Sequence, residues 1–430
     1  MRLYLAEKPD QARNIARIIG IKDGGDGFIT LKNGDVFTWV IGHLLEQCEP
    51  QDYKPEWKRW SWAQLPMIPD TWKMNKVKGK TKQLNVISKL LKKADTCVIC
   101  TDAGREGELI AREVLEFYKF KGNVERLWLQ TLVDSDIREA LNNILPGSAK
   151  EPLYRAALAR SHADWLYGMN LSRGATLAAG DTSPVGRVQT PTLAMVVKRD
   201  LEIDNFKAKE YYELEATVDT AEGHKLTLSH APKEAYRIYE KSKADSLKSQ
   251  AEGASGPLSV KQSKGKDAPQ LPFSLSTLQR EASKQLGLSA SKTLEVAQAL
   301  YEKKVLSYPR TDCPYLSSAQ KPEVPSTLDA VRKCLPDQVK KLEEMGTVLR
   351  NRVFDDAKLS DHHGIIPTRE YRELNGMELK VYQLVALRFM QAIAPDRHFD
   401  ATKITMDANG VPFGTSGRIV TSPGWSSLSI

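Results

Sequence analysis

One short segment, TDAGREGE at residues 101–108, constrains the fold of this chain more than any other. It follows an apolar run at residues 97–100 and precedes apolar residues at helical spacing. A buried strand, an acidic turn with glycines and a helix form the repeating unit of α/β domains with a parallel sheet. The first 145 residues continue this alternation, with strands predicted at 3–6 and 36–41 and helices at 11–19 and from Lys82. We therefore expect an N-terminal α/β domain with a mainly parallel sheet.

The spacing of apolar residues changes several times after residue 150. The predicted segments are helical structure over about 150–200, with its clearest pattern at 154–169, an antiparallel sheet over 207–262 and a linker at 263–272. They continue with helices at 276–286 and 291–302 and alternating strand residues at 402–406, followed by an Asn409-Gly410 hairpin turn. β structure thus occurs on both sides of a helical insert. We expect one sheet that the chain leaves and later re-enters.

Composition narrows the class of protein. The 430 residues suffice for about two to four domains, and no run of roughly 18 apolar residues predicts a membrane span. A formal charge of +8 favours a polyanionic partner. The five cysteines are widely scattered and odd in number, which argues against a disulfide framework and for the cytoplasm.

Charged residues follow two of the predicted strands. Glu7 and Lys8 come after the first strand, and Asp102, Glu106 and Glu108 come after the strand at 97–100. Ligands of α/β sheets bind at such strand ends, and clustered carboxylates repel one another unless a cation neutralises them. Oxygen ligands of this kind suit Mg²⁺. The alternative is that Glu7 and Lys8 are a solvated pair and that the glutamates are first-turn acids favoured by the helix dipole.

A third cluster, SYPRTD at 307–312, contains a candidate nucleophile. Pro309 restricts Tyr308 to extended geometry, which would display the phenol on a loop or strand end. Arg310 could hold a phosphate next to it. The phenol would need nearby cations and a proton acceptor to react. The alternative is an ordinary turn with a half-buried tyrosine.

Three further segments contain candidate binding residues, and two of them allow an alternative interpretation. Arg187 and Gln189 in VGRVQTP could bind phosphates or lie in an ordinary loop. The Trp-rich and basic segment at 53–62 could stack on unpaired bases or pin a loop to the core. The segment DHHG at 361–364 has paired histidines, but no further ligand stands at metal-binding spacing, and Cys97 and Cys100 are interpreted as core residues.

Together these segments resemble the type IA DNA topoisomerases, and most closely their bacterial topoisomerase III branch. The matching segments occur in the family's order over nearly the whole chain. They are LAEKP at 5–9, IGHLLEQ at 41–47, TKQLNVI at 81–87, TDAGREGE at 101–108, ARSHADWLYGMN at 159–170, VGRVQTP at 185–191, LPFSLSTLQREA at 271–282, SYPRTDC at 307–313 and DHHGIIPT at 361–368.

The resemblance implies a multidomain architecture of α/β and α+β type. The implied parts are a Toprim α/β domain at 1–148, the first part of a helical strand-binding domain at 149–205, the first part of a β-rich arch at 206–268, a winged-helix-like domain with the catalytic tyrosine at 269–375 and the return of the arch at 376–430. This division agrees with the changes of spacing described above.

The resemblance also implies the reaction and its residues. Tyr308 would attack single-stranded DNA and become joined to a 5′-phosphate, and the free 3′-hydroxyl would later reseal the strand without ATP. Glu7 would move the proton of the 3′ oxygen and could touch the metal, while Lys8 and Arg310 would hold the phosphate. Mg²⁺ would be bound by Asp102 and Glu106, and His362 would support the site. The residues implied to grip the strand are Trp60, Arg160, Trp165, Arg173, Val185, Gly186, Arg187, Val188 and Gln189.

The implied substrates are single-stranded and negatively supercoiled DNA, which would be relaxed or decatenated by a monomer associated with the nucleoid. Two features depart from the family pattern. Gly104 replaces a second aspartate found in many members, so weaker or differently arranged Mg²⁺ binding is expected. The chain also stops soon after the returning strands, where the family continues. The alternative function is therefore a truncated or impaired relative that binds single strands without completing strand passage.

Overall fold

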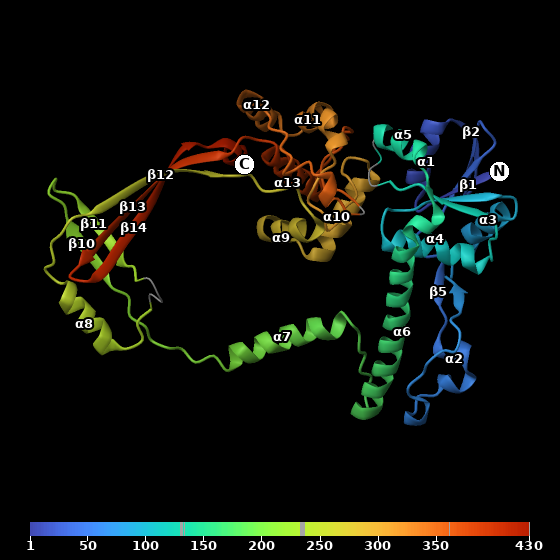
Figure 1. Cartoon of the computed structure of the whole chain (residues 1–430), viewed down its shortest axis with the longest axis horizontal. Helices are drawn as coiled ribbons and strands as arrows, with labels where there is room; N and C mark the ends of the chain where they lie inside the picture. Colours follow the sequence, from blue (N-terminus) through green and yellow to red (C-terminus); the bar gives the residue numbers. More distant parts are fainter. Residues whose placement is uncertain (130–131, 133, 233–236, 361, 430) are drawn as a thin grey trace.

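The computed structural model describes residues 1–129, 132, 134–232, 237–360 and 362–429. The chain starts in an α/β domain, runs out along two helices to a sheet at the far end, and returns to a helical body beside the α/β domain (Figure 1). Residues distant in the sequence therefore meet where the helical body and the α/β domain lie together.

The α/β domain is built on a sheet with the strand order β2-β3-β4-β1-β7-β8-β9. The strands are β1 (Arg2–Ala6), β2 (Ile21–Gly25), β3 (Phe28–Leu31), β4 (Val36–Trp39), β7 (Thr96–Cys100), β8 (Asn123–Arg126) and β9 (Leu145–Pro146). The central strands β4, β1, β7 and β8 are parallel, and the outer pairs are antiparallel. The predicted parallel arrangement is thus present in the centre of the sheet, but the three outer pairings are antiparallel and equal the three parallel ones in number.

Helices cover both faces of this sheet. One face carries α3 (Thr81–Leu91) and α4 (Arg105–Phe117), and the other carries α1 (Pro9–Ile19) and α5 (Asp134–Asn142). The side chains of β1 alternate between the two apolar cores, since Leu3 and Leu5 pack on one face while Tyr4 and Ala6 pack on the other. Burial on both faces fixes the strand ends in space.

A long helix and a small hairpin extend from this domain. Helix α6 (Glu151–Ala179) packs on α4, while β5 (Leu45–Gln47) pairs with β6 (Met74–Lys76), and α2 (Pro50–Tyr53) lies between those strands in the chain. Trp57, Met67 and Trp165 form a small core between this extension and α6. The Trp-rich segment thus pins a loop through Trp57 and leaves Trp60 and Trp62 exposed.

Helix α7 (Gln189–Asp204) then carries the chain away from the α/β domain (Figure 1). None of its residues, all of which the structure describes, is buried. Leu193, Met195 and Ile203 are each more than 60% exposed. This helix has apolar side chains and no packed core.

The far sheet has the strand order β10-β11-β14-β13-β12 and is antiparallel. Its strands are β10 (Glu215–Asp219), β11 (Lys225–His230), β12 (Ser259–Asp267), β13 (Arg397–Ala408) and β14 (Val411–Ser422), with α8 (Lys241–Ala251) between β11 and β12 in the chain. The predicted departure and return of the chain is confirmed, and Asn409 and Gly410 form the expected turn with φ values of 55° and 88°. The linker prediction was wrong for residues 263–267, which pair with β13 because their extended backbone completes its ladder.

The helical body contains α9 (Leu275–Leu286), α10 (Ala290–Glu302), α11 (Val324–Arg332), α12 (Pro336–Met345) and α13 (Gly376–Ala392) around one apolar core. Helix α13 supplies many of its buried residues, although the boundary expected at residue 376 assigned that helix to the returning arch. Leu428, near the end of the chain, is also fully buried in this core. In the part of the chain that the structure describes, helices are too short or too polar to cross a bilayer.

Candidate active site

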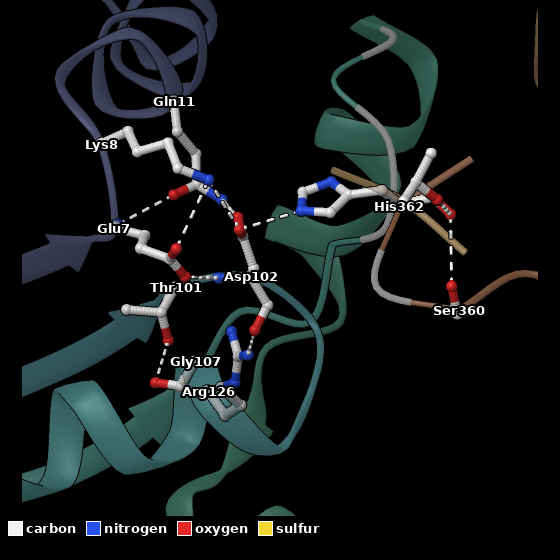
Figure 2. Close-up of polar contacts among 10 residues, drawn as sticks. Glu7, Lys8, Gln11, Thr101, Asp102, Gly107, Arg126, Ser360 and His362 are labelled. Atoms are coloured by element: carbon white, nitrogen blue, oxygen red, sulfur yellow. Dashed lines mark hydrogen bonds and ion pairs between the residues drawn. The ribbon is translucent and has the colours of Figure 1, made fainter. Parts of the chain in front are cut away.

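Strand pairing brings the two charged segments together. β1 and β7 are parallel neighbours with Ala6 opposite Cys100, so the residues that follow them leave the sheet at the same edge. The backbone N–H of Asp102 donates to Glu7 Oε2 at 3.1 Å. Gln11 in the first turn of α1 joins both segments, because its Oε1 accepts from the Glu7 N–H and its Nε2 donates to Asp102 Oδ1 (Figure 2).

Lys8 lies between the two carboxylates. Its Nζ is 2.9 Å from Asp102 Oδ2 and 3.4 Å from Glu7 Oε1. The ammonium group also lies over the ring of Tyr308, 4.2 Å from the ring centre. One cation therefore contacts both acids and the candidate nucleophile.

Tyr308 and His362 reach this pocket from the helical body. His362 Nε2 is 3.0 Å from Asp102 Oδ2, and Figure 2 shows its ring pointing at that carboxylate. The Tyr308 ring packs at 4.4 Å from the His362 ring and at 5.3 Å from the Tyr301 ring. The structure thus brings together Glu7, Lys8, Asp102, Tyr308 and His362, as the sequence analysis expects.

The neighbouring acids differ in their ionisation. Burial, together with the charge of Asp102, raises the pKa of Glu7 above its ordinary value. Burial acts on Asp102 in the same direction, but its hydrogen bonds and ion pairs with His362 and Lys8 outweigh it and lower the Asp102 pKa. Two carboxylates with diverging pKa values are suited to different tasks, one exchanging a proton and the other remaining charged.

Glu7 and Asp102 provide some of the oxygen ligands that a hard cation such as Mg²⁺ requires. Among the residues that the structure describes, no three His, Cys, Asp or Glu side chains converge closely enough to hold a metal ion. Glu7 and Asp102 nevertheless already share the ammonium of Lys8, and both present oxygen. Mg²⁺ is commonly bound through one or two carboxylates together with substrate phosphates and water, so this pair is compatible with it.

A second hollow of about 540 Å³ adjoins this pocket on the side of α6 and contains the predicted catalytic residue Arg310 and the predicted metal ligand Glu106. Arg310, Glu106, Arg160 and His362 line it. Glu106 is half exposed, with Arg160 Nη1 at 3.6 Å and His43 Nε2 at 3.5 Å. Glu106 thus faces a basic hollow and makes no direct contact with Asp102 in the contacts described.

The residues expected to grip DNA fall into three groups by exposure. Trp60, Arg160, Arg187, Val188 and Gln189 are exposed, whereas Val185 and Gly186 are half-buried. Arg187 forms an ion pair with Asp164 on α6.

Trp165 and Arg173 are buried beneath this surface. Trp165 Nε1 donates to the Cys48 carbonyl at 3.0 Å, and Arg173 Nη1 donates to the Trp57 carbonyl at 2.5 Å. The Arg173 guanidinium also lies 5.1 Å from the ring centre of Trp60. These two side chains hold the surface on which Trp60 is displayed.

Sequence reasoning missed several residues of the site. Gln11 bridges Glu7 and Asp102, Arg126 supports Asp102 from below, and His43 contacts Glu106 and Glu113. Gln11 could have been found from its spacing of three residues after Lys8. Arg126 could not, because a lone arginine at a strand end gives no local sign of its partners. In the DHHG segment, Asp361 lies outside the described residues.

Comparison with known proteins identifies the class. The family model for DNA topoisomerase matches residues 148–429, and that for the Toprim domain matches residues 2–132. With the full-length relatives described next, these matches show that the chain belongs to the type IA family of bacterial DNA topoisomerases, which are isomerases.

The relatives within that family carry a more particular name. The chain is 37% identical to the DNA topoisomerase 3 of Vibrio cholerae, over 100% of this chain and 70% of that protein. It is 36% identical to the DNA topoisomerase 3 of Bacillus subtilis, over 99% of this chain and 59% of that protein. The fold resembles that of full-length topoisomerase I from Thermotoga maritima, with a TM-score of 0.62, 24% identity, and coverage of 99% of this chain and 67% of that one.

Proposed function

We propose that this chain cleaves and rejoins one strand of DNA through a covalent link between Tyr308 and a 5′-phosphate, and so relaxes negative supercoils or separates linked DNA. One observation carries the proposal. The ring of Tyr308 lies 4.2 Å from the ammonium of Lys8, although the two residues are 300 positions apart and belong to different parts of the fold. A tyrosine with a purely structural role is not expected to lie among two acids, a lysine and a histidine, whereas a nucleophile is.

The proposed chemistry assigns distinct tasks to these residues. The phenol of Tyr308 gives up its proton to solvent, and its oxygen forms a bond to phosphorus while the bond to the 3′ oxygen breaks. On resealing, the phenol takes a proton back from solvent. Glu7, whose pKa is raised by burial and by Asp102, gives a proton to that oxygen and takes it back during resealing. Lys8 and Arg310 hold the phosphate and stabilise its developing charge.

A divalent cation completes the proposed site. Glu7 and Asp102, with Glu106 four positions after Asp102, are the residues that would hold Mg²⁺, which would supply charge stabilisation at the scissile phosphate. Asp102 Oδ2 contacts Lys8 and His362, whereas Oδ1 accepts one hydrogen bond, from Gln11, and so keeps a lone pair that could serve a cation.

The strand would reach Tyr308 through the basic hollow. Arg160 and Arg310 line that hollow. Asp164 on α6 pairs with both Arg160 and Arg187, and the exposed Gln189 begins α7. Trp60 provides an exposed ring for stacking on an unpaired base. Splayed bases can make such contacts, so single strands are the favoured substrate.

The decisive experiment uses a single-stranded oligonucleotide labelled at its 3′ end, which stays on the fragment joined to the tyrosine, with Mg²⁺ and denaturing gel analysis for a covalent protein–DNA adduct. Wild type is expected to form the adduct and to relax negatively supercoiled plasmid, and Tyr308→Phe is expected to lose both activities. Tyr301→Phe is the matched control, because Tyr301 packs against Tyr308 and is not assigned to chemistry. Adduct formation by Tyr308→Phe would exclude Tyr308 as the nucleophile.

The same assay distinguishes the proposed activity from the alternative function, in which the chain binds single strands without completing strand passage. A wild-type chain that binds the oligonucleotide and forms no adduct would be a strand-binding relative. A chain that forms the adduct but leaves plasmid supercoiled would cleave without completing strand passage.

A further inference from the structure

A buried ion pair lies directly under the acidic turn. Arg126 at the end of β8 and Glu108 in the first turn of α4 are both 0% exposed, and Arg126 Nε lies 2.5 Å from Glu108 Oε1. The other carboxylate oxygen of Glu108 accepts from Arg112 Nε at 2.9 Å. Glu108 is therefore neutralised inside the protein, which explains why this third acid of the TDAGREGE segment does not face the site.

Arg126 uses its remaining donors on backbone carbonyls around Asp102. Its Nη2 donates to the Asp102 carbonyl at 2.9 Å, and its Nη1 donates to the carbonyls of Ile99 and Leu127 at 3.2 and 2.6 Å. One side chain thereby joins the end of β7, the end of β8 and the acidic turn. Figure 2 shows the guanidinium reaching the turn from the side opposite Lys8 and His362.

The turn has little freedom around this anchor. Thr101 Oγ1 donates to the Gly107 carbonyl at 2.7 Å, which closes the turn against the first turn of α4. A Cβ added at Gly107 would lie 2.1 Å from the Asp102 carbonyl oxygen, so helix and turn are in close backbone contact. The carbonyl that Arg126 holds is the same one that Gly107 approaches.

A buried ion pair is weak evidence for stability, because desolvation cancels much of the attraction between its charges. Here the pair is joined to the backbone of the residue whose carboxylate contacts Gln11, Lys8 and His362. We propose that Arg126, anchored by Glu108, is a positioning residue that sets the direction of the Asp102 carboxylate and thereby the affinity of the site for a divalent cation. This inference rests on the proposed function, since it concerns the cation that the strand cleavage requires.

The experiment measures metal binding directly, without DNA and without turnover. Mn²⁺, a paramagnetic probe, is titrated into the full chain, and free Mn²⁺ is followed by electron paramagnetic resonance. Arg126→Lys keeps the charge but cannot reach Glu108 and three carbonyls together, and we expect it to weaken Mn²⁺ binding about tenfold. Glu108→Gln keeps an oxygen that can accept from Arg126 but removes the negative charge of its anchor, and is expected to weaken binding less, about threefold.

Arg350→Lys is the matched control. Arg350, in the helical body, likewise donates to a backbone carbonyl, of Ala394 at 2.7 Å, and to a carboxylate, of Asp396 at 2.8 Å. We expect this control to lose thermal stability comparably and to bind Mn²⁺ like wild type. Binding of a single-stranded oligonucleotide in EDTA should be unchanged in all three variants.

The outcomes separate a positioning role from a merely structural one. Unchanged Mn²⁺ affinity in folded Arg126→Lys, or an equal loss in Arg350→Lys, would overturn the proposal. If Arg126→Lys does not fold, Glu108→Gln decides in the same way. Failure of the proposed function would appear in a different assay, as adduct formation by Tyr308→Phe. The Mn²⁺ titrations contain no DNA, so their outcome is independent of that result.

Discussion

The α/β domain and helix α7 contain similar apolar side chains, but the α/β domain buries them and α7 exposes them to solvent. Leu5 in β1 is 0% exposed between two layers, whereas Leu193 in α7 is 62% exposed. In the α/β domain, packing on both faces of the sheet fixes the strand ends that carry Glu7 and Asp102. In α7, helical hydrogen bonds hold the backbone while the apolar surface stays open. Groups that must meet within about 3 Å are therefore built on the packed part.

The largest expected effect tests this contrast in stability. Leu5→Ala removes a fully buried side chain and is expected to lower the free energy of unfolding by about 2–5 kcal/mol. Leu193→Ala, the same substitution in α7, is expected to change it by less than about 0.5 kcal/mol. Urea unfolding followed by circular dichroism measures both. Equal losses would show that α7 is packed in solution and would remove the contrast.

The free energy of unfolding should depend on pH through a buried histidine of the helical body. Burial lowers the pKa of His363, in the helical body, from 6.5 to about 4, although a hydrogen bond to the Gly364 carbonyl opposes this. The unfolded chain therefore takes up this proton first as the pH falls. The stability associated with neutral His363 is present above about pH 6.5 and is lost as the pH falls towards 4, by up to about 3 kcal/mol.

His363→Gln removes this titration, so the wild-type free energy of unfolding should fall more steeply between pH 7 and pH 4 than that of the variant. His224→Gln, at an exposed turn of the far sheet, is the control and should follow the wild-type curve. Parallel curves for wild type and His363→Gln would mean that folding does not lower the pKa of His363. That result would group His363 with the open part of the molecule instead of the packed part.

The same contrast explains what the sequence could predict. Strand and helix positions in the α/β domain follow from local spacing, because burial imposes a period on the residues themselves. The site could be anticipated at strand ends for Glu7 and Asp102, and its link to Tyr308 came from resemblance to a family. Arg126 and Gln11 could not be predicted, because their partners are set by tertiary contacts across the sheet edge. The five residues at 263–267 were misassigned because their polar composition does not reveal a pairing partner that lies more than 100 positions away.

The smallest expected effect on stability lies at the junction of the two regions. Asp164 on α6 pairs with Arg187 just before α7, and the two side chains are 40% and 51% exposed. Asp164→Asn should therefore change the free energy of unfolding by less than about 0.5 kcal/mol. It should nevertheless strengthen binding of a single-stranded oligonucleotide a few-fold, because Arg187 no longer has a carboxylate competing with phosphate.

Fluorescence anisotropy in EDTA at two salt concentrations measures this binding, and the gain should shrink at high salt. Glu202→Gln is the matched control, since Glu202 forms an exposed ion pair with Arg199 within α7 at 3.0 Å, away from the basic hollow. Equal gains in both variants would indicate a general effect of net charge. A gain confined to Asp164→Asn would show that an ion pair of negligible value to the fold controls access of the strand to the packed part of the molecule, where the chemistry is proposed to occur.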